Sequence, residues 1–196
     1  LEIANDAYGI PFYKGKSLKG KWREHTQVIA DALSVNKPHL AADLKSMVQR
    51  NFGKADRTAS FSANLKLSDC VVGQSIRDHL QQACESGEIR SDELLDAYTE
   101  IRYFTAIDGQ TGAAKQHSLR QYRVIRARLK LEEEVDRVAG LDDHESGLLA
   151  AGVAALRHVG SMQSRGKGEI RLELCHQNDD VTAHYLNLLR KWVQQS

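Results

Sequence analysis

The chain has 196 residues, 41% of them hydrophobic and 27% charged, and its 27 Lys and Arg against 26 Asp and Glu leave a formal charge of +1 at pH 7. This composition is typical of a globular protein and excludes collagen-like, low-complexity and intrinsically disordered chains. No stretch approaches the roughly 20 apolar residues of a membrane span, and the start LEIANDAYG lacks the basic and apolar regions of a signal peptide. We therefore predict one cytoplasmic domain, residues 1–196, with no membrane partner.

A chain of this length can bury a core of its own without disulfides or a metal. Its three cysteines, Cys70, Cys84 and Cys175, show no C-x-x-C spacing, so we expect buried thiols and no zinc site. No cofactor is expected to be required for folding.

Helical and strand periodicities alternate in the first half of the chain. The spacing of apolar residues predicts a helix from Ser17 to Leu33, with Ser17 as its N-cap. A second helix should follow Pro38 and end near Gly53, and the alternating stretch FSANLKLSDCVV after it predicts a half-buried strand. The apolar residues expected on the buried face of the first helix are Leu18, Trp22, Val28, Ile29 and Leu33.

Residues 74–97 return to helical spacing, with a break expected at Gly87, and residues 99–134 predict a long β-hairpin. Its second strand should extend through QYRVIRARLKLEEEV, where Arg126, Arg128 and Lys130 would line one face. Small apolar residues in 144–159 predict a buried helix, EIRLEL at 169–174 a strand, and residues 180–194 an amphipathic helix.

The order of these elements predicts an α+β fold. Helix, strand, strand, helix, strand is the order of a ferredoxin-like (RRM-type) βαββαβ core without its first strand. The helices of residues 38–53 and 74–97 are then insertions, and we expect the first strand to lie upstream of Leu1.

Basic and acidic residues occupy different parts of the sequence. Between Gly109 and Leu131 every charged residue is basic, and the acids are concentrated on either side of this segment. A row of cations on the hairpin would suit a polyanion such as RNA, and the alternative is a solvated charged strand face. The bases are Lys115, Arg120, Arg123, Arg126, Arg128 and Lys130.

The histidine and the aromatic residues on the same hairpin each have more than one interpretation. His117 lies among the bases, where it can contact RNA, act as an acid or base, or be a plain surface residue. Tyr103, Phe104 and Tyr122 can stack on nucleobases or fill the core.

Two glycine-containing segments, GIPFYKGKS and GSMQSRGKG, do not have the spacing of a nucleotide phosphate loop, so ATP hydrolysis is not expected. They can still bind phosphates of a polynucleotide. Lys14, Lys16 and Lys19 cluster at a predicted helix N-terminus, and Arg165 and Lys167 lie in the second, glycine-rich segment.

Four segments in this order resemble motifs of the CRISPR-associated RAMP superfamily, most closely the backbone subunit of type III effector complexes. They are IPFYKGKSLKGKWR, FGKADRTASFSANLKLSDCVV, EIRYFTAIDGQTGAAKQHSLRQYRVI and VGSMQSRGKGEIRLEL. The resemblance implies an RNA-binding subunit with a thumb-like hairpin at about 99–134 and a glycine-rich loop at 160–168. Its implied partners are crRNA, single-stranded target RNA, other RAMP subunits and the large subunit of the complex.

The resemblance also assigns residues to RNA contacts. Gly15, Ser17 and Arg23 join the lysines in a crRNA-facing loop and helix start, Asp108 and Thr111 belong to the hairpin, and Ser164 and Gly166 belong to the glycine-rich loop. With the bases and His117, the full predicted set is Lys14, Gly15, Lys16, Ser17, Lys19, Arg23, Asp108, Thr111, Lys115, His117, Arg120, Arg123, Ser164, Arg165, Gly166 and Lys167.

The sequence is compatible with a catalytic and with a non-catalytic subunit. In members that cut target RNA, the resemblance places a catalytic Asp in a segment that would precede Leu1, with Mg²⁺ as the cofactor. Asp6 is the nearest acid in this sequence and matches a turn position instead. The alternatives are a RAMP endoribonuclease that processes precursor crRNA with a histidine and no metal, and a structural subunit that does not contact RNA.

Overall fold

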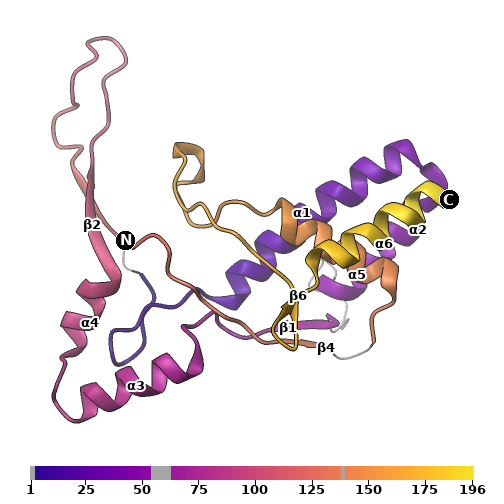
Figure 1. Cartoon of the computed structure of the whole chain (residues 1–196). Coiled ribbons are helices and arrows are strands. Elements are labelled where there is room, and N and C mark those ends of the chain that lie inside the picture. The colour runs from indigo at the N-terminus through magenta and orange to yellow at the C-terminus, as the bar shows by residue number, and fades with distance from the viewer. Residues whose placement is uncertain (1–2, 54–62, 138–139) are drawn as a thin grey trace. The chain divides into compact units, whose positions relative to one another are not determined.

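The structure is a computed structural model that describes residues 3–53, 63–137 and 140–196. The chain divides into two compact units: unit 1 comprises Leu1–Gly15 and Ser68–Glu134, and unit 2 comprises Lys16–Leu67 and Val135–Ser196. The elements in chain order (Figure 1) are α1 (Gly15–Asn36), η1 (Pro38–Leu40), α2 (Ala41–Phe52), β1 (Leu65–Leu67), α3 (Gln74–Glu85), α4 (Ser91–Tyr98), β2 (Thr99–Phe104), β3 (Arg120–Ile125), β4 (Val135–Arg137), α5 (Asp143–Ala155), η2 (Gln163–Arg165), β5 (Cys175–His176), β6 (Asp179–Asp180) and α6 (Thr182–Gln195).

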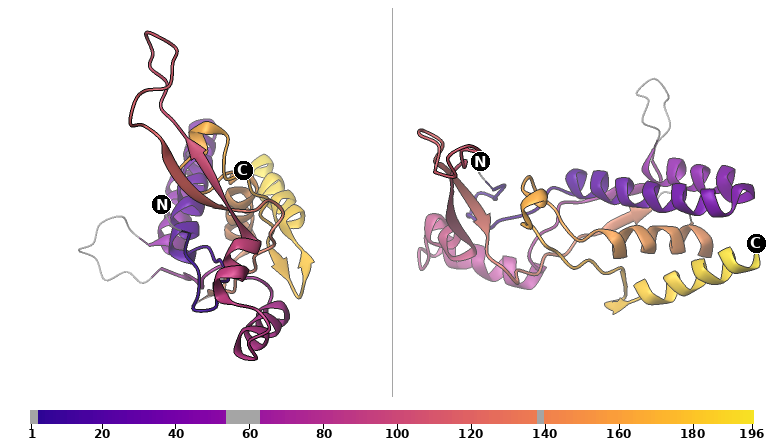
Figure 2. Two further views of the ribbon diagram at one scale, coloured as in Figure 1. Left: turned by 90° about the vertical axis from the view of Figure 1, so that its left-hand side faces the viewer. Right: turned by 90° about the horizontal axis from the view of Figure 1, so that it is seen from above.

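The core of unit 2 is built around α5, which is buried along most of its length, as its small apolar sequence predicts. Figure 2 shows α5 beside α1 and α6. The indole Nε1 of Trp22 on α1 donates a hydrogen bond of 2.9 Å to the Leu149 carbonyl of α5. Gly147 lies against Leu189 of α6, so small residues on α5 let both helices approach closely.

The buried stripe of α1 differs from the predicted one. It consists of Leu18, Trp22, Thr26 and Ala30, spaced four residues apart, whereas Val28 is 63% exposed. Val28 is two residues from Thr26 and therefore about 200° around the helix, on the opposite side. The packed face therefore contains the fully buried Thr26 in place of the larger apolar residue that was predicted there. The Thr26 hydroxyl donates to the Trp22 carbonyl at 2.8 Å.

Strands in unit 2 are short. β1 and β4 form an antiparallel pair in the register Leu65↔Arg137, and Leu65 is buried. The strand predicted at residues 61–72 is therefore reduced to its centre, and Phe61 lies outside the described residues. The tail helix is confirmed as α6.

The prediction of a strand for EIRLEL at residues 169–174 is wrong, because these residues form no regular strand. The Ile170 amide donates to the Arg157 carbonyl, and the Leu174 amide donates to the Thr182 hydroxyl, so two of its amides bond to a loop and a helix start instead of a neighbouring strand. The regular pairing begins only at β5, which forms a tight hairpin with β6.

Unit 1 has a smaller core, with Ile10, Val72 and Leu94 at its centre. α3 and α4 are separated at Gly87, as predicted. β2 pairs with β3 from Thr99↔Ile125 to Phe104↔Arg120, which confirms the predicted hairpin.

The second strand of the hairpin is shorter than predicted. β3 ends at Ile125, and the chain turns at Arg128, which has a positive φ of 70°. Leu129 and Leu131 beyond this turn pack against the core of unit 1, so the apolar residues are buried as expected although the strand does not continue.

The predicted α+β class is confirmed. The described residues form three antiparallel sheets, each of two strands. None of the helices in the described part of the chain is both long and apolar enough to cross a membrane.

Candidate nucleic-acid interface

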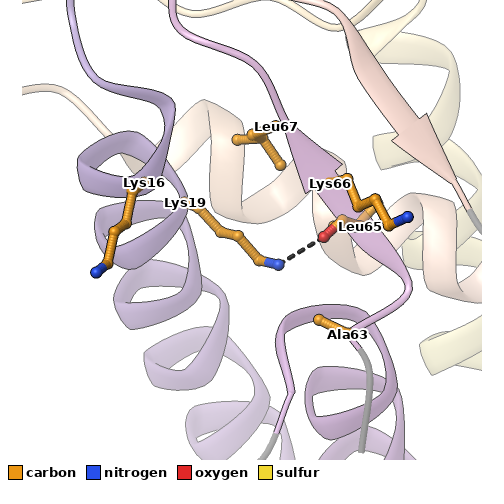
Figure 3. Close-up of a pocket in the computed structure, with 6 residues that line it drawn as sticks. All are labelled: Lys16, Lys19, Ala63, Leu65, Lys66 and Leu67. Atoms are coloured by element: carbon orange, nitrogen blue, oxygen red, sulfur yellow. Dashed lines mark hydrogen bonds between the residues drawn. The ribbon is translucent and has the colours of Figure 1, made fainter.

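Three lysines on α1 and β1, Lys16, Lys19 and Lys66, line an open cavity of about 360 Å³ in unit 2, and we call them the lysine row. Figure 3 shows Lys19 reaching from α1 towards β1, where its Nζ donates to the Leu65 carbonyl at 2.5 Å. Lys16 points away from β1, and Lys66 projects from the strand away from α1. The three charges are therefore spread across the two elements, which suits successive phosphates of a chain better than one isolated anion.

The positive charges of the lysine row are not compensated by nearby carboxylates in the described structure. Lys19 is half-buried, and burial lowers the pKa of its ammonium group, with a further contribution from the neighbouring Arg23. Neither Lys16 nor Lys66 forms an ion pair with any residue that the structure describes. The row is therefore a cationic surface whose charge is available to a polyanion.

The start of α1 is capped by a residue from another segment. The Gly15 amide donates to Asp69 Oδ1 at 2.9 Å, and Gly15 is buried. Ser17 was predicted to be the N-cap, and this is wrong, because the helix begins two residues earlier and Ser17 lies exposed in its first turn. The Asp69 carboxylate already occupies a position at this N-terminus where a phosphate was expected.

Next to Asp69, a buried thiol contacts a carboxylate. Cys70 Sγ donates to Glu133 Oε2 at 3.1 Å, and Glu133 Oε1 is buried with no hydrogen-bond partner among the described residues. Burial raises the pKa of Glu133 above its ordinary value and Asp69 adds to this, whereas the Cys70 hydrogen bond lowers it. The folded state therefore holds the Glu133 proton more tightly than the unfolded chain does.

Glu133→Gln should raise the stability of the protein near neutral pH. The ionised carboxylate costs stability, and this cost appears as the pH rises from the unfolded pKa through the higher folded pKa. The midpoint of thermal unfolding should increase at about pH 8, and the gain should shrink towards about pH 4, where both states carry the proton. Glu134→Gln, at the exposed neighbouring position, should show no such pH-dependent gain. Equal pH profiles for the two variants would contradict this prediction.

The glycine-rich loop of unit 2 is a closed turn around η2. The Val159 amide donates to the Gly168 carbonyl at 2.8 Å, and Gln163 Nε2 donates to the Gly160 carbonyl at 2.8 Å. A Cβ at Gly168 would lie 1.9 Å from the Val159 carbonyl oxygen, so this closure requires glycine. Arg165 and Lys167 are exposed on the loop with Gly166 between them, and the side chain of Ser164 lies outside the described part of the structure.

The tip of the hairpin is shaped by Asp108. Its Oδ1 accepts hydrogen bonds from the amides of Gln110 and Thr111 and from the Thr111 hydroxyl. These bonds, the one from the Thr111 amide foremost, hold the pKa of Asp108 below its ordinary value. Both predicted contact residues, Asp108 and Thr111, therefore form the turn that presents the neighbouring side chains.

The predicted cations of the hairpin divide into two groups. Arg123 Nη1 donates to Asp96 Oδ1 at 2.6 Å and to the Thr99 hydroxyl at 2.9 Å, so its charge is compensated within unit 1. Lys115, His117 and Arg120 are exposed. Lys115 and Arg120 make no ion pair within the described segments. Lys115 and Arg120 therefore carry exposed charge on the tip side of Arg123, and Arg126 and Arg128 are exposed beyond the end of β3.

Asp6 lies in a turn of unit 1. Its Oδ1 accepts the amides of Tyr8 and Ile10, each at 3.0 Å, and its Oδ2 accepts Arg77 Nη2 at 3.4 Å. Across the described residues, no group of three or more His, Cys, Asp or Glu is arranged to hold a metal ion. The Asp6 carboxylate is thus used to close the turn that precedes Pro11.

With this geometry in place, comparison with known proteins gives the family. A model of the RAMP superfamily matches residues 1–171. The chain belongs to the RAMP superfamily. No curated protein matches it.

Among solved structures, the RAMP chain is similar to a chain of "Cryo-EM structure of the Type III-B Cmr-beta bound to cognate target RNA". The two have 11% sequence identity and a TM-score of 0.52, over 86% of this chain and 87% of that one. At this identity the similarity shows a shared fold.

Two residues of the RAMP chain at this interface were not predicted. Lys66 lies between the inward-facing Leu65 and Leu67, so the alternation of β1 could have identified it as an exposed cation beside Lys19. Asp69 had no such signal, because its contact with Gly15 joins segments 54 residues apart in the sequence.

Proposed function

We propose that this RAMP chain is the crRNA-binding backbone subunit of a type III CRISPR ribonucleoprotein effector complex, in which it positions the guide for recognition of single-stranded target RNA. Its partners would be other RAMP subunits and the large subunit of the complex. The observation that carries this proposal is the set of exposed cations without ion-pair partners in the described structure. On the lysine row and the glycine-rich loop of unit 2, the two segments that the proposal uses, they are Lys16, Lys66, Arg165 and Lys167, and the exposed cations elsewhere in this unit, such as Lys45 and Lys191, lie on other elements.

A guide RNA must keep its base edges free for pairing. A subunit that holds it should therefore contact the phosphates with Lys and Arg side chains and read no sequence. The lysine row and the glycine-rich loop present such side chains. Glycines keep the loop small, so that Arg165 and Lys167 can approach a phosphate closely.

We also propose that unit 2 is the ferredoxin-like core. α1 and α5 lie side by side, and β1 pairs antiparallel with β4, as the two helices and the central hairpin of such a core would. Residues 169–174 then take the place of its last strand.

The test replaces Lys16, Lys19 and Arg165 together with alanine. Affinity for unrelated guide sequences should fall about equally, because no base is read. The slope of log affinity against log salt should flatten by roughly 0.7 for each lost phosphate contact. Filter binding or fluorescence anisotropy at several salt concentrations measures both quantities.

A matched triple variant separates phosphate contact from net charge. Lys21, Lys45 and Lys191 lie outside the proposed contacts, and Lys21 already pairs with Glu24 at 2.8 Å. Replacing these three with alanine should leave the salt slope close to that of the parent. Equal slopes for the parent and the Lys16, Lys19, Arg165 variant would overturn the proposal, and site-specific cleavage of repeat RNA in EDTA would favour a processing endoribonuclease.

Asp6 has no catalytic role in this proposal, because its carboxylate already accepts two amides and Arg77. Cleavage of target RNA with Mg²⁺ would require another acid. The readout is cleavage of guide-complementary RNA by the assembled complex, in which Asp6→Ala should not selectively abolish cutting.

A further inference from the structure

The two faces of the β2–β3 hairpin differ in chemistry. Successive residues of a strand point to opposite faces, so the register of the pair assigns each side chain to one of them. Arg102 and Phe104 on β2 share a face with Arg120 and Tyr122 on β3, and we call this the aromatic face. Ile101 and Tyr103 lie on the opposite face.

The aromatic face carries a fixed ring pair. Phe104 and Tyr122 contact edge to face, with their ring centroids 5.5 Å apart and an interplanar angle of 76°. Both side chains are half-buried, so each ring keeps exposed surface while the contact limits its motion. Rings held in this way lose little conformational entropy when a ligand stacks on them.

A cation without an ion-pair partner in the described structure adjoins the rings. Arg120 is directly opposite Phe104 in the register and is exposed, whereas Arg102 on the same face is paired with Glu100. Proteins that bind single-stranded nucleic acid combine aromatic rings with cations, because a base stacks on the ring and the cation contacts the phosphate beside it.

The opposite face lacks this combination. Ile101 is 48% and Tyr103 60% exposed. The arginine on that face, Arg123, is held by Asp96 and Thr99. Tyr103 has no ring contact of the kind that fixes Tyr122, within the residues described.

We propose that Phe104 and Tyr122, with Arg120 beside them, form a stacking platform for an unpaired base of the bound RNA. This inference rests on the proposed function and adds the class of ligand that the hairpin recognises. A base in a duplex is stacked on both sides and shows only its edges, so the platform selects a single-stranded nucleotide.

The test compares Tyr122→Leu with Tyr103→Leu in the full chain. The probes are a single-stranded RNA and the same RNA with abasic sites, which keeps the phosphates and removes the bases. Tyr122→Leu should weaken binding of the ordinary RNA by roughly 5- to 100-fold, leave binding of the abasic RNA unchanged, and preserve the salt slope. Tyr103→Leu should have little effect on either probe, and Arg120→Ala should flatten the slope by roughly 0.7.

Other outcomes overturn the inference. If Tyr103→Leu lowered the affinity for the ordinary RNA but not for the abasic RNA, and Tyr122→Leu did not, stacking would be assigned to the opposite face. If Tyr122→Leu lowered the affinity for both RNA probes equally, the ring pair would only support the structure of the hairpin. If the parent binds RNA with the expected salt slope while these results fail, only the platform is wrong, whereas a parent that binds no RNA would remove the proposed function as well.

Discussion

Gly152→Ala should lower the free energy of unfolding by about 3 kcal/mol, because it forces a methyl group between two packed helices. The added Cβ would lie 2.0 Å from Thr26 Oγ1 and 3.0 Å from Trp22 Cδ1. Thr26 is fully buried and its hydroxyl bonds to the Trp22 carbonyl, so neither side chain can move aside without breaking the contact between α1 and α5. Urea unfolding followed by tryptophan fluorescence measures this change, since both tryptophans of the chain, Trp22 and Trp192, lie in unit 2.

Gly20→Ala is the matched control for this substitution. Gly20 is exposed within α1, and a Cβ there would meet nothing within 4 Å. Alanine should therefore raise stability by about 0.5 to 1 kcal/mol through its better helix propensity. A Gly152→Ala protein as stable as the parent would show that α1 and α5 do not pack as described.

In unit 1 the largest effect should come from Gly9→Ala. Gly9 has a φ of +82°, and a Cβ there would lie 2.0 Å from the carbonyl oxygen of Ser91. The obstacle is backbone, which cannot rotate away as a side chain can, and the positive φ adds strain for any residue with a Cβ. We expect a loss of about 3 kcal/mol, because α4 must be displaced from the turn beside Ile10.

Hydrogen exchange of the α3 and α4 amides measures the Gly9→Ala effect, since unit 1 contains no tryptophan. Gly109→Ala at the hairpin tip, where a Cβ meets nothing within 4 Å, should leave this exchange unchanged. Parent-like protection of α4 in Gly9→Ala would argue against the tight contact with Ser91.

The helices were predicted well where local sequence determines them. α2 begins just after Pro38 and ends before Gly53, and α5 is buried all round, as its apolar composition requires. Val28 was wrongly predicted to be buried, because the five apolar residues of α1 fit more than one face of the helix. The face that is buried is the one that packs on α5, which the sequence of α1 does not show. The strand predictions failed at Arg128 and at residues 169–174 because strand length depends on partners distant in the sequence.

The structure locates the residues of the candidate site, and their RNA contacts stay predictions. Charge segregation and glycine placement predicted contacts at Lys16, Lys19 and Arg165, and the family match confirms the resemblance from which the other contacts were predicted. Sequence alone could not show that Asp69 bonds to Gly15 or that Asp108 forms the hairpin turn, because these roles depend on the directions of hydrogen bonds.

The bond from Lys19 to Leu65 has a consequence for the RNA contact proposed for this lysine. An ammonium group has three N–H donors, and the carbonyl of β1 takes one of them. The bond fixes a long, flexible side chain before any RNA arrives, and the remaining two donors can still reach a phosphate. In the proposed complex, part of the ordering cost of Lys19 would already be met by the fold, whereas the exposed side chain of Lys16 would be ordered only on binding. Two lysines about one helical turn apart would thus contribute unequally to the proposed RNA contact, and the half-buried Lys19 would be the better ordered of the two.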